Sequence, residues 1–370
     1  MPGSPIMRKV LITSHTFAPE RNGVAGVVEA VALGLLELGW SVDIATCAVA
    51  GSPESETYRG LRVFRFELQG NGATGVVGEL ERFHAFLRTE AYGRYLTNGV
   101  LSWATDLILD CPSIAKSDVV LVSHGFSSYE NPGLASYHSE LFRKCRELRA
   151  VVCLSDRLSD YFHYREAGLK NVRVISNGVY SSKWAGGDGA GRETPYVVNI
   201  SNHNPLKGHG LYAELAGEIG GVQFRQVGTG YRAAKWSLGR IGVMGGCWYA
   251  CKIRALGGRV RYLDGSNRET VHQGLAGSLM KVLTSSWEAA PLVLLEAMAA
   301  GKAWVSTDVG CVRSWPGGVV CASKAEMGAA VRKLLEDPAR RAALGQEGRE
   351  AAQNVYDWRQ IVKIYSDVLA

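Results

Sequence analysis

Short runs of apolar residues recur along the first half of the chain, and each has the length of a buried strand rather than of a helix. These runs lie at Lys9–Thr13, Val42–Thr46, Val119–Ser123, Ala150–Asp156 and Val172–Ile175. Residues 25–38, between the first two runs, carry apolar residues at helical spacing and predict a helix that ends at Gly39. The order strand, loop, helix, strand is typical of a parallel sheet, so the pattern predicts an α/β domain.

The stretch between residues 47 and 118 has a less regular pattern. Leu61–Phe66 alternates like a strand, whereas Gly70–Gly78 is rich in glycine and predicts a mobile loop. Helices are predicted between Glu79 and Ala104, and we expect their aromatic residues to lie in the core rather than at a ligand. These aromatic residues are Phe83, Phe86, Tyr92, Tyr95 and Trp103.

The second half repeats the pattern of short apolar runs. They lie at Tyr196–Ile200, Val222–Val227, Val260–Leu263, Leu279–Leu283 and Ala303–Ser306. A glycine-rich linker at 184–194 separates the halves, and a final helix carries Ile361, Ile364, Tyr365 and Val368. The sequence therefore predicts an α/β fold of two Rossmann-like parallel-sheet domains, at 1–182 and 195–350, with a terminal segment at 351–370.

The most informative stretch runs from Leu283 to Gly310. Pro291 suits the first position of a helix of about three turns, and Gly301 suits the left-handed position after its end. Glu296 is the only polar residue between them, so we expect this helix to be buried nearly all round. Glu288 lies in the preceding loop, where the helix dipole and free N–H groups favour an anionic or sugar ligand.

Each glutamate alone is more readily explained as a structural residue, Glu296 as a cap for neighbouring backbone and Glu288 as a solvated loop residue. Together with Pro291, Leu292 and the Ala-Met-Ala-Ala-Gly run, however, they resemble the Glu-x7-Glu signature of retaining GT-B glycosyltransferases, family four. The resemblance implies that Glu288 faces the donor sugar, that Glu296 holds the nucleotide ribose, and that the two domains face each other across a cleft. It also implies that 1–182 is the acceptor-side domain, that 195–350 is the nucleotide-sugar donor domain, and that the helix at 351–370 crosses back to the first domain. Ala289 and Ala290 replace the usual Gly-Phe.

Three further loops resemble those of the same family. The loop at 19–25 is similar to its Pro-x-x-Gly-Gly-x-Ala loop, which closes over the donor phosphates; Asn22 replaces the first glycine and Gly23 is kept. The loop is not the dinucleotide fingerprint, because G-x-G-x-x-G is absent. His124 follows a strand and is either a structural histidine or a hydrogen-bonding group at the donor sugar, as the family often has there.

The third loop, at 201–209, resembles the family's Gly-Arg-x-x-x-x-Lys-Gly loop that grips the donor pyrophosphate. Lys207 matches the lysine, and a lysine before a glycine and a helix is well placed for a phosphate. Asn202 stands in the arginine's place. The missing phosphate contact is either absent or made by His203, His209 or a residue elsewhere.

Composition narrows the class of protein. With 370 residues, 46% hydrophobic and 21% charged, the chain can bury two large cores. It has no apolar run of the ~20 residues that a membrane span needs and no signal-peptide layout at its start. Its eight cysteines are scattered through a large chain, so we expect reduced thiols. Cys247 and Cys251 form a C-x3-C pair, but no second ligand pair follows at zinc spacing, so we expect no zinc site. We therefore expect a cytoplasmic protein.

Charge is uneven along the chain. Up to Tyr180 there are 18 basic and 19 acidic residues, whereas the remainder of the chain holds 23 basic and 16 acidic residues. We expect the second half to bind the anion, and no nucleic acid, since no nucleic-acid motif accompanies the charge. Basic residues interleave with aromatic ones over residues 225–261, either as a solvated insertion or as a surface for an anionic membrane or lipid-linked acceptor at the inner face of the membrane.

The resemblance implies transfer of a hexosyl group from a nucleoside-diphosphate sugar, as donor substrate, to a hydroxyl acceptor with retention of configuration. The acceptor classes are a cell-surface glycan, as in polysaccharide biosynthesis, a lipid-linked saccharide or a small-molecule glycoside. No Asp-x-Asp motif stands at a strand end, so we expect no metal and no other cofactor. The alternatives are a non-catalytic GT-B partner subunit and a GT-B-type sugar-nucleotide epimerase or phosphorylase.

Overall fold

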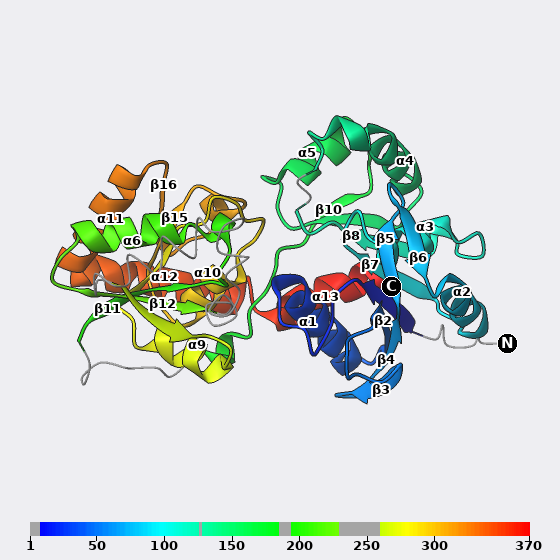
Figure 1. The fold of residues 1–370 in the computed structure, drawn as a ribbon, viewed down its shortest axis with the longest axis horizontal. Helices are drawn as coiled ribbons and strands as arrows, with labels where there is room; N and C mark the ends of the chain where they lie inside the picture. Colours follow the sequence, from blue (N-terminus) through cyan, green and yellow to red (C-terminus); the bar gives the residue numbers. More distant parts are fainter. Residues whose placement is uncertain (1–7, 126–127, 185–193, 229–259) are drawn as a thin grey trace, which may run out of the picture. The chain divides into compact units, whose positions relative to one another are not determined.

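The computed structural model describes residues 8–125, 128–184, 194–228 and 260–370. The chain forms two compact units, which are coloured by sequence in Figure 1. Unit 1 consists of Met1–Asn177 and Trp358–Ala370, and unit 2 of Gly178–Asp357. Residues 178–182 and 351–357, which the predicted boundaries assign to the first domain and to the terminal segment, therefore belong to unit 2.

Unit 1 is built on an eight-stranded sheet in the order β10-β9-β8-β7-β1-β2-β4-β3, parallel except for the β3–β4 pair. Its strands are β1 (Lys9–Ser14), β2 (Ser41–Cys47), β3 (Ser55–Tyr58), β4 (Leu61–Phe66), β7 (Arg94–Asn98), β8 (Val119–Val122), β9 (Ala150–Cys153) and β10 (Val172–Val174). Its α-helices are α1 (Gly23–Glu37), α2 (Leu80–Thr89), α3 (Trp103–Asp110), α4 (Ala135–Cys145), α5 (Ser159–Glu166) and α13 (Trp358–Leu369). Leu11 of β1 pairs with Asp43 and with Tyr95, which fixes the register at the centre of the sheet.

Two predictions in unit 1 are wrong. The segment expected as a mobile loop forms an antiparallel pair, β5 (Leu68–Asn71) with β6 (Gly75–Gly78). Glycine permits this close pairing, since a Cβ on Gly70, whose φ is +90°, would lie 2.0 Å from the Gly75 carbonyl oxygen. Between α2 and α3 the chain also forms strand β7, where only helices were expected. Its sequence, Arg-Tyr-Leu-Thr-Asn, has too few apolar residues to stand out.

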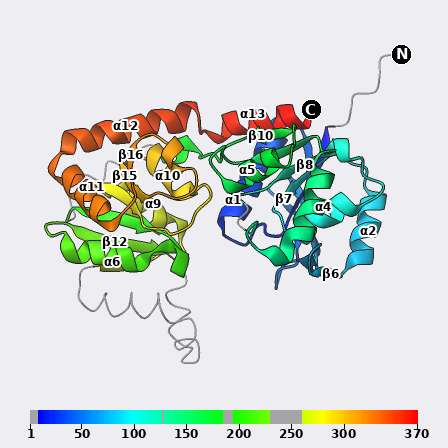
Figure 2. The ribbon, with the colours of Figure 1, turned by 90° about the horizontal axis from the view of Figure 1, so that it is seen from above.

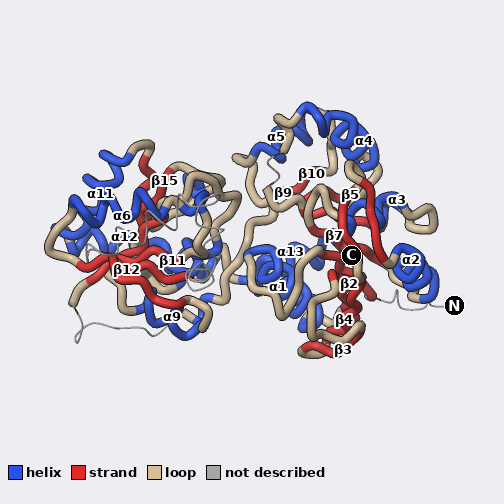
Figure 3. The backbone as a smooth tube through the Cα atoms, viewed as in Figure 1, coloured by secondary structure: helices blue, strands red, loops and turns tan. Residues whose placement is uncertain are grey.

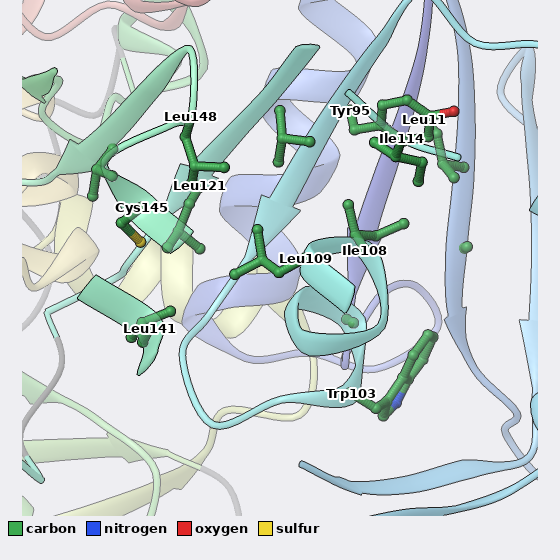
Figure 4. Close-up of a cluster of buried hydrophobic side chains, with 14 of the residues drawn as sticks. Leu11, Tyr95, Trp103, Ile108, Leu109, Ile114, Leu121, Leu141, Cys145 and Leu148 are labelled. Atoms are coloured by element: carbon green, nitrogen blue, oxygen red, sulfur yellow. The ribbon is translucent and has the colours of Figure 1, made fainter. Parts of the chain in front are cut away.

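The aromatic residues of this region lie in the core, as predicted. Phe83, Tyr95 and Trp103 are buried in one hydrophobic cluster, and Phe86 and Tyr92 pack against it. Figure 4 shows part of this cluster, in which side chains of β1, β7 and α3 meet residues of α4. Burial of this cluster joins the sheet to the helices that follow β7 and β8.

Helix α13 completes unit 1 by packing against α1. Gly34 of α1 makes the close approach possible, since a Cβ there would lie 2.6 Å from a methyl group of Val362. The Trp40 indole N–H donates to the Ser366 hydroxyl oxygen at 3.0 Å. The buried side chains of α13 are Trp358, Ile361, Val362, Tyr365 and Leu369.

Unit 2 holds a six-stranded parallel sheet in the order β13-β12-β11-β14-β15-β16. Its strands are β11 (Tyr196–Ile200), β12 (Gln223–Gly228), β13 (Val260–Asp264), β14 (Met280–Leu283), β15 (Trp304–Thr307) and β16 (Gly318–Cys321). Its α-helices are α6 (His209–Glu218), α9 (Arg268–Ala276), α10 (Leu292–Ala299), α11 (Lys324–Glu336) and α12 (Pro338–Asn354). Figure 2 shows α6 on one side of this sheet and α10 with α12 on the other, and Figure 3 shows the strands between helices.

Helix α10 is shorter than predicted. Pro291 precedes it as the N-cap, because its ψ of 105° is extended rather than helical, so the prediction that Pro291 is the first helical residue is wrong. Gly301 takes the left-handed position after the helix, as expected, with φ +66°. Leu292, Val293 and Glu296 are only half-buried, so the helix keeps one face that is not enclosed. Among the described residues, no helix combines the length and the apolar character that a membrane crossing requires.

Candidate active site

The order in which the chain adds strands to the sheet of unit 2 reverses between β11 and β14, which are neighbours in the sheet. From β11 the chain adds β12 and β13 on one side, and from β14 it adds β15 and β16 on the other. In doubly wound sheets the loops at such a point diverge and leave a crevice for a ligand at the carboxyl ends of the strands. The loops that follow β11 and β14 carry Lys207 and Glu288, so the residues predicted to contact the donor pyrophosphate and the donor sugar share this place.

The loop after β11 is fastened to the end of β14. Residues Pro205–Lys207 form a single 3₁₀ turn, which the Asn204 side chain caps by accepting from the Leu206 N–H at 2.9 Å. Gly208 follows in the left-handed conformation, at φ +61°, and a Cβ there would lie 1.8 Å from the Thr284 carbonyl oxygen. The Ser286 N–H donates to the Leu206 carbonyl at 2.8 Å. The backbone that carries Lys207 is therefore held against the residues that lead to Glu288.

Lys207 and Glu288 form an ion pair across these two loops. The Lys207 Nζ lies 2.7 Å from Glu288 Oε1, and the side chains are 28% and 12% exposed. The Ser285 hydroxyl donates to the same carboxylate oxygen at 2.7 Å. A partly buried pair of this kind interacts more strongly than one in bulk water, and both side chains remain partly exposed to solvent.

Glu296 lies on α10 with its side chain 14% exposed. Burial raises the pKa of this carboxyl above its usual value, and the Arg268 guanidinium is the strongest influence that lowers it again. Arg268 Nη2 lies 3.3 Å from Glu296 Oε1, but the arginine side chain is 74% exposed. The carboxylate therefore has a solvated and replaceable partner.

The remaining predicted donor-site residues of unit 2 lie in the same two loops. Asn202 is exposed and His203 half-buried in the loop after β11, where the His203 ring lies 4.7 Å from that of His209. His209 Nε2 and the Ser201 hydroxyl are 3.0 Å apart. Pro291 is buried before α10, and Leu292 opens that helix half-buried.

Asn22, Gly23 and His124 belong to unit 1. Asn22 caps α1 by accepting from the Ala25 N–H at 2.9 Å, and Gly23 is the first residue of the helix. The loop that contains them follows β1, which stands beside β7 where the strand order of unit 1 reverses. The Asn22 side chain therefore caps α1, which the glycine usual at this position in the family could not do, because glycine has no side chain.

His124 follows β8 and has a left-handed backbone, at φ +59°. Its Nε2 lies 2.9 Å from Asn98 Oδ1, while the Asn98 amide nitrogen donates to the Thr13 carbonyl at 3.2 Å. Since the amide nitrogen of Asn98 is used in this way, its oxygen faces the imidazole and Nε2 is the donor. Burial lowers the pKa of His124 to about 4, so the ring is neutral at pH 7 and Nδ1 is an acceptor.

Two residues that contact the predicted glutamates were not predicted from the sequence. Ser285 lies within the informative stretch, and a serine three residues before the glutamate is a signal that could have been used. Arg268 stands 28 positions from its partner Glu296, and nothing in the local pattern distinguishes it from other surface arginines.

Residues 249–351 match the family model described as glycosyl transferases group 1. Over these residues the chain is similar to the glycosyl transferases of group 1. The matched segment includes Arg268, Glu288 and Glu296, and the match confirms the prediction that the chain is a glycosyltransferase.

Solved structures of similar fold cover both units of the glycosyltransferase. A sucrose-phosphate synthase from Thermosynechococcus elongatus superposes with a TM-score of 0.76 at 18% identity, over 97% of this chain and 98% of that one. HepE of Anabaena, in complex with UDP-glucose, superposes with a TM-score of 0.73 at 16% identity, over 98% of this chain and 99% of that one. WaaG, a glycosyltransferase involved in lipopolysaccharide biosynthesis, superposes with a TM-score of 0.68 at 14% identity, over 98% of this chain and 99% of that one. These likenesses confirm the GT-B fold. No curated protein matches the chain by sequence.

Proposed function

We propose that the protein transfers a hexosyl group from a nucleoside-diphosphate sugar to a hydroxyl acceptor, with retention of anomeric configuration. The observation that carries the proposal is the Lys207–Glu288 pair at the switch point of the unit 2 sheet. A donor of this class also agrees with the UDP and UDP-glucose complexes of HepE, a protein of similar fold. Retention and the fourth glycosyltransferase family rest on the Glu-x7-Glu resemblance.

Departure of the nucleotide is the difficult step. As the bond between the anomeric carbon and the phosphate oxygen breaks, negative charge grows on the diphosphate and positive charge on the sugar ring. The Lys207 ammonium and the N-terminus of α10 are suited to stabilise the first charge, and the Glu288 carboxylate is suited to stabilise the second or to orient the sugar. When the diphosphate binds, Lys207 exchanges part of its interaction with Glu288 for the phosphate oxygens.

Glu296 is suited to hold the ribose. A carboxylate accepts two hydroxyl hydrogens in a bidentate manner, and its present partner, Arg268, is largely in water. Because the Arg268 side chain is already largely in water, its exchange for two ribose hydroxyls leaves no buried cation without a partner.

A panel of nucleoside-diphosphate sugars, followed by assay of the released nucleotide, tests the proposal. At least one donor should be cleaved in an acceptor-dependent manner. The Glu288→Gln variant, which keeps the size of the side chain and removes its charge, should lose most of this activity. Full activity in Glu288→Gln would remove this residue from the catalytic machinery.

A non-catalytic GT-B partner subunit is the second candidate. It is favoured by three departures from the family pattern, namely Asn22, Asn202 and Ala290. Release of nucleotide from any donor by the purified chain would exclude it. Binding of a donor without release, restored by a second protein, would support it. An epimerase or phosphorylase would instead convert or phosphorolyse the sugar without an acceptor hydroxyl.

We further propose that the reaction needs no metal or other cofactor and takes place in the cytoplasm, either in solution or at the inner face of the membrane. Activity that persists in excess EDTA is the expected result for the metal. The basic aromatic segment proposed as a membrane contact lies mostly outside the described residues. Arg225 at its start does not serve that role, because it is buried and its guanidinium lies 3.7 Å from the centre of the Tyr196 ring.

Co-sedimentation with vesicles tests the remainder of residues 225–261. We expect more protein to bind vesicles with anionic lipid than neutral vesicles. Equal recovery with both kinds of vesicle would remove the membrane contact.

A further inference from the structure

Strand β14, which leads directly to the Glu288 loop, contains a lysine that the reaction described above does not use. Lys281 is the second residue of the strand Met-Lys-Val-Leu, and its side chain is 0% exposed. It pairs with Val198 of β11 on one side and with Trp304 of β15 on the other. A charged group in the middle of a parallel sheet is costly to desolvate, and such groups persist where they are hydrogen-bonded.

The Lys281 ammonium is surrounded by acceptors. Its Nζ donates to Asn199 Oδ1 at 2.7 Å, to the Val282 carbonyl at 3.2 Å and to the Ile200 carbonyl at 3.5 Å. Two of these acceptors belong to the last residues of β11, immediately before the loop that carries Lys207. Lys281 therefore ties together the carboxyl ends of β11 and β14, on either side of the switch point.

A chain of side chains continues from Lys281 to the site. Since Asn199 Oδ1 accepts from Lys281, the amide nitrogen of Asn199 faces the opposite way, and it lies 3.5 Å from the Thr284 hydroxyl. That hydroxyl donates to the Lys207 carbonyl at 3.2 Å. The backbone position of Lys207 is thus linked, through two uncharged side chains, to the buried ammonium.

We propose that Lys281 is a positioning residue of the donor site. Through Asn199 and Thr284 it holds the turn of Lys207 in place. This role rests on the proposed function, since it concerns how well the site is arranged to bind and cleave the donor. Lys281 itself touches no donor atom in this scheme.

The charge of Lys281 depends on pH in the physiological range. Burial lowers the pKa of the ammonium to about 7; Glu288 and Glu296 oppose this shift, and Lys207 adds to it. The ammonium is protonated below this pKa and loses its charge as the pH rises through about 7. The arrangement of the site, and donor turnover with it, should therefore decline on the alkaline side of neutrality.

Steady-state kinetics on the full chain test this role, with donor KM and kcat measured between pH 5.5 and 9. Lys281→Met keeps the length of the side chain and removes the charge. It should lower kcat/KM for the donor by roughly 10- to 100-fold, as expected for displacement of a reacting group by less than about 1 Å. It should also flatten the alkaline limb of the profile. Lys324→Met, the same change at a surface lysine of unit 2, is the matched control and should behave as the wild type.

A second variant keeps the test decisive if Lys281→Met does not fold. Asn199→Asp places a carboxylate against the ammonium, which favours the charged form and should move the alkaline limb to higher pH. A wild-type profile in either folded variant would refute the positioning role. A wild-type protein that consumes no nucleotide-sugar would refute the proposed function itself and remove the basis for this role.

Discussion

Lys207 and Glu288 form an ion pair between two loops of unit 2. In the absence of a donor, the contact of 2.7 Å neutralises both groups and limits the freedom of two flexible side chains. Under the proposed function, a diphosphate that binds beside Lys207 would meet a cation whose backbone is already fixed by Gly208 and Thr284. Some of the conformational entropy that ordering these side chains removes is therefore lost on folding rather than on binding.

Substitution of Lys207 by alanine tests the role of this cation. Loss of the group that stabilises the departing diphosphate should reduce kcat by roughly 10²- to 10³-fold, the range seen when one stabilising donor is removed from a charged transition state. The release of nucleotide from the donor is the measurement. Lys324→Ala, at a surface lysine paired with Glu214 and Glu218, is the control. Near-normal turnover in Lys207→Ala would mean that another cation holds the phosphates.

The Glu296→Ala variant should weaken binding of the nucleotide without its sugar. A hydrogen bond to a charged group contributes about 1.5–3 kcal/mol, so the loss of ribose contacts should raise the dissociation constant by at least about tenfold. Titration calorimetry with the nucleoside diphosphate gives this value directly. Arg268→Ala, which removes only the exposed partner of Glu296, should bind with nearly wild-type affinity. An unchanged affinity in Glu296→Ala would exclude the ribose role.

The sequence alone singles out Glu288, Glu296 and Lys207 as candidate site residues, because each lies within a recognisable local motif. It does not lead to their partners. Arg268 and Lys281 reach the site through the folding of α9 and β14, and no short-range pattern encodes a contact over such separations. The lysine within the apolar run Leu-Met-Lys-Val-Leu is nevertheless a signal, since a central strand rarely tolerates a charge without a purpose.

Among the secondary elements, the strands and turns that border the site are the most constrained. The close approach of Gly208 to Thr284 requires both a left-handed backbone and the absence of a side chain. This one position thereby keeps the loop after β11 in contact with the loop after β14.

Gly208→Ala should therefore destabilise unit 2 by about 1–3 kcal/mol, the usual cost of a strained backbone, and should reduce donor turnover. Unfolding by urea and the nucleotide-release assay provide the two measurements. Gly220→Ala is the matched control, because a Cβ on Gly220 would meet no atom within 4 Å. If the two variants are equally stable and active, the contact does not constrain the loop.

Apolar runs of four to seven residues predicted most strands within one or two residues, since burial on both faces leaves a continuous hydrophobic signature. Elements without that signature escaped. Strand β7 has a mixed sequence, β16 begins with a glycine that lies against the face of Trp304, and the β5–β6 pair is rich in glycine. In each case contacts from elsewhere in the fold, rather than local preference, decide the conformation.

For the molecule as a whole, the division into two units means that a donor nucleotide bound to unit 2 should stabilise that unit. At about 100 times its dissociation constant, a nucleotide should add about 2.7 kcal/mol to the stability of unit 2. Scanning calorimetry should show this shift in the wild type, and a much smaller one in Glu296→Ala at the same ligand concentration. An equal shift in both proteins would place the nucleotide away from α10.

The two crossings of the chain between the units lie next to each other within unit 2. The Val179 N–H, just after the first crossing, donates to the Tyr356 carbonyl at 2.7 Å. Val179 also forms a parallel β-bridge with Asp357, just before the second crossing. Unit 2 is in effect inserted into unit 1. During synthesis on the ribosome, α1 consequently cannot pack against α13 until all of unit 2 has been made. Until then the Gly34 face of α1 and the Trp40 indole lack the α13 residues, Val362 and Ser366, that they contact in the folded unit.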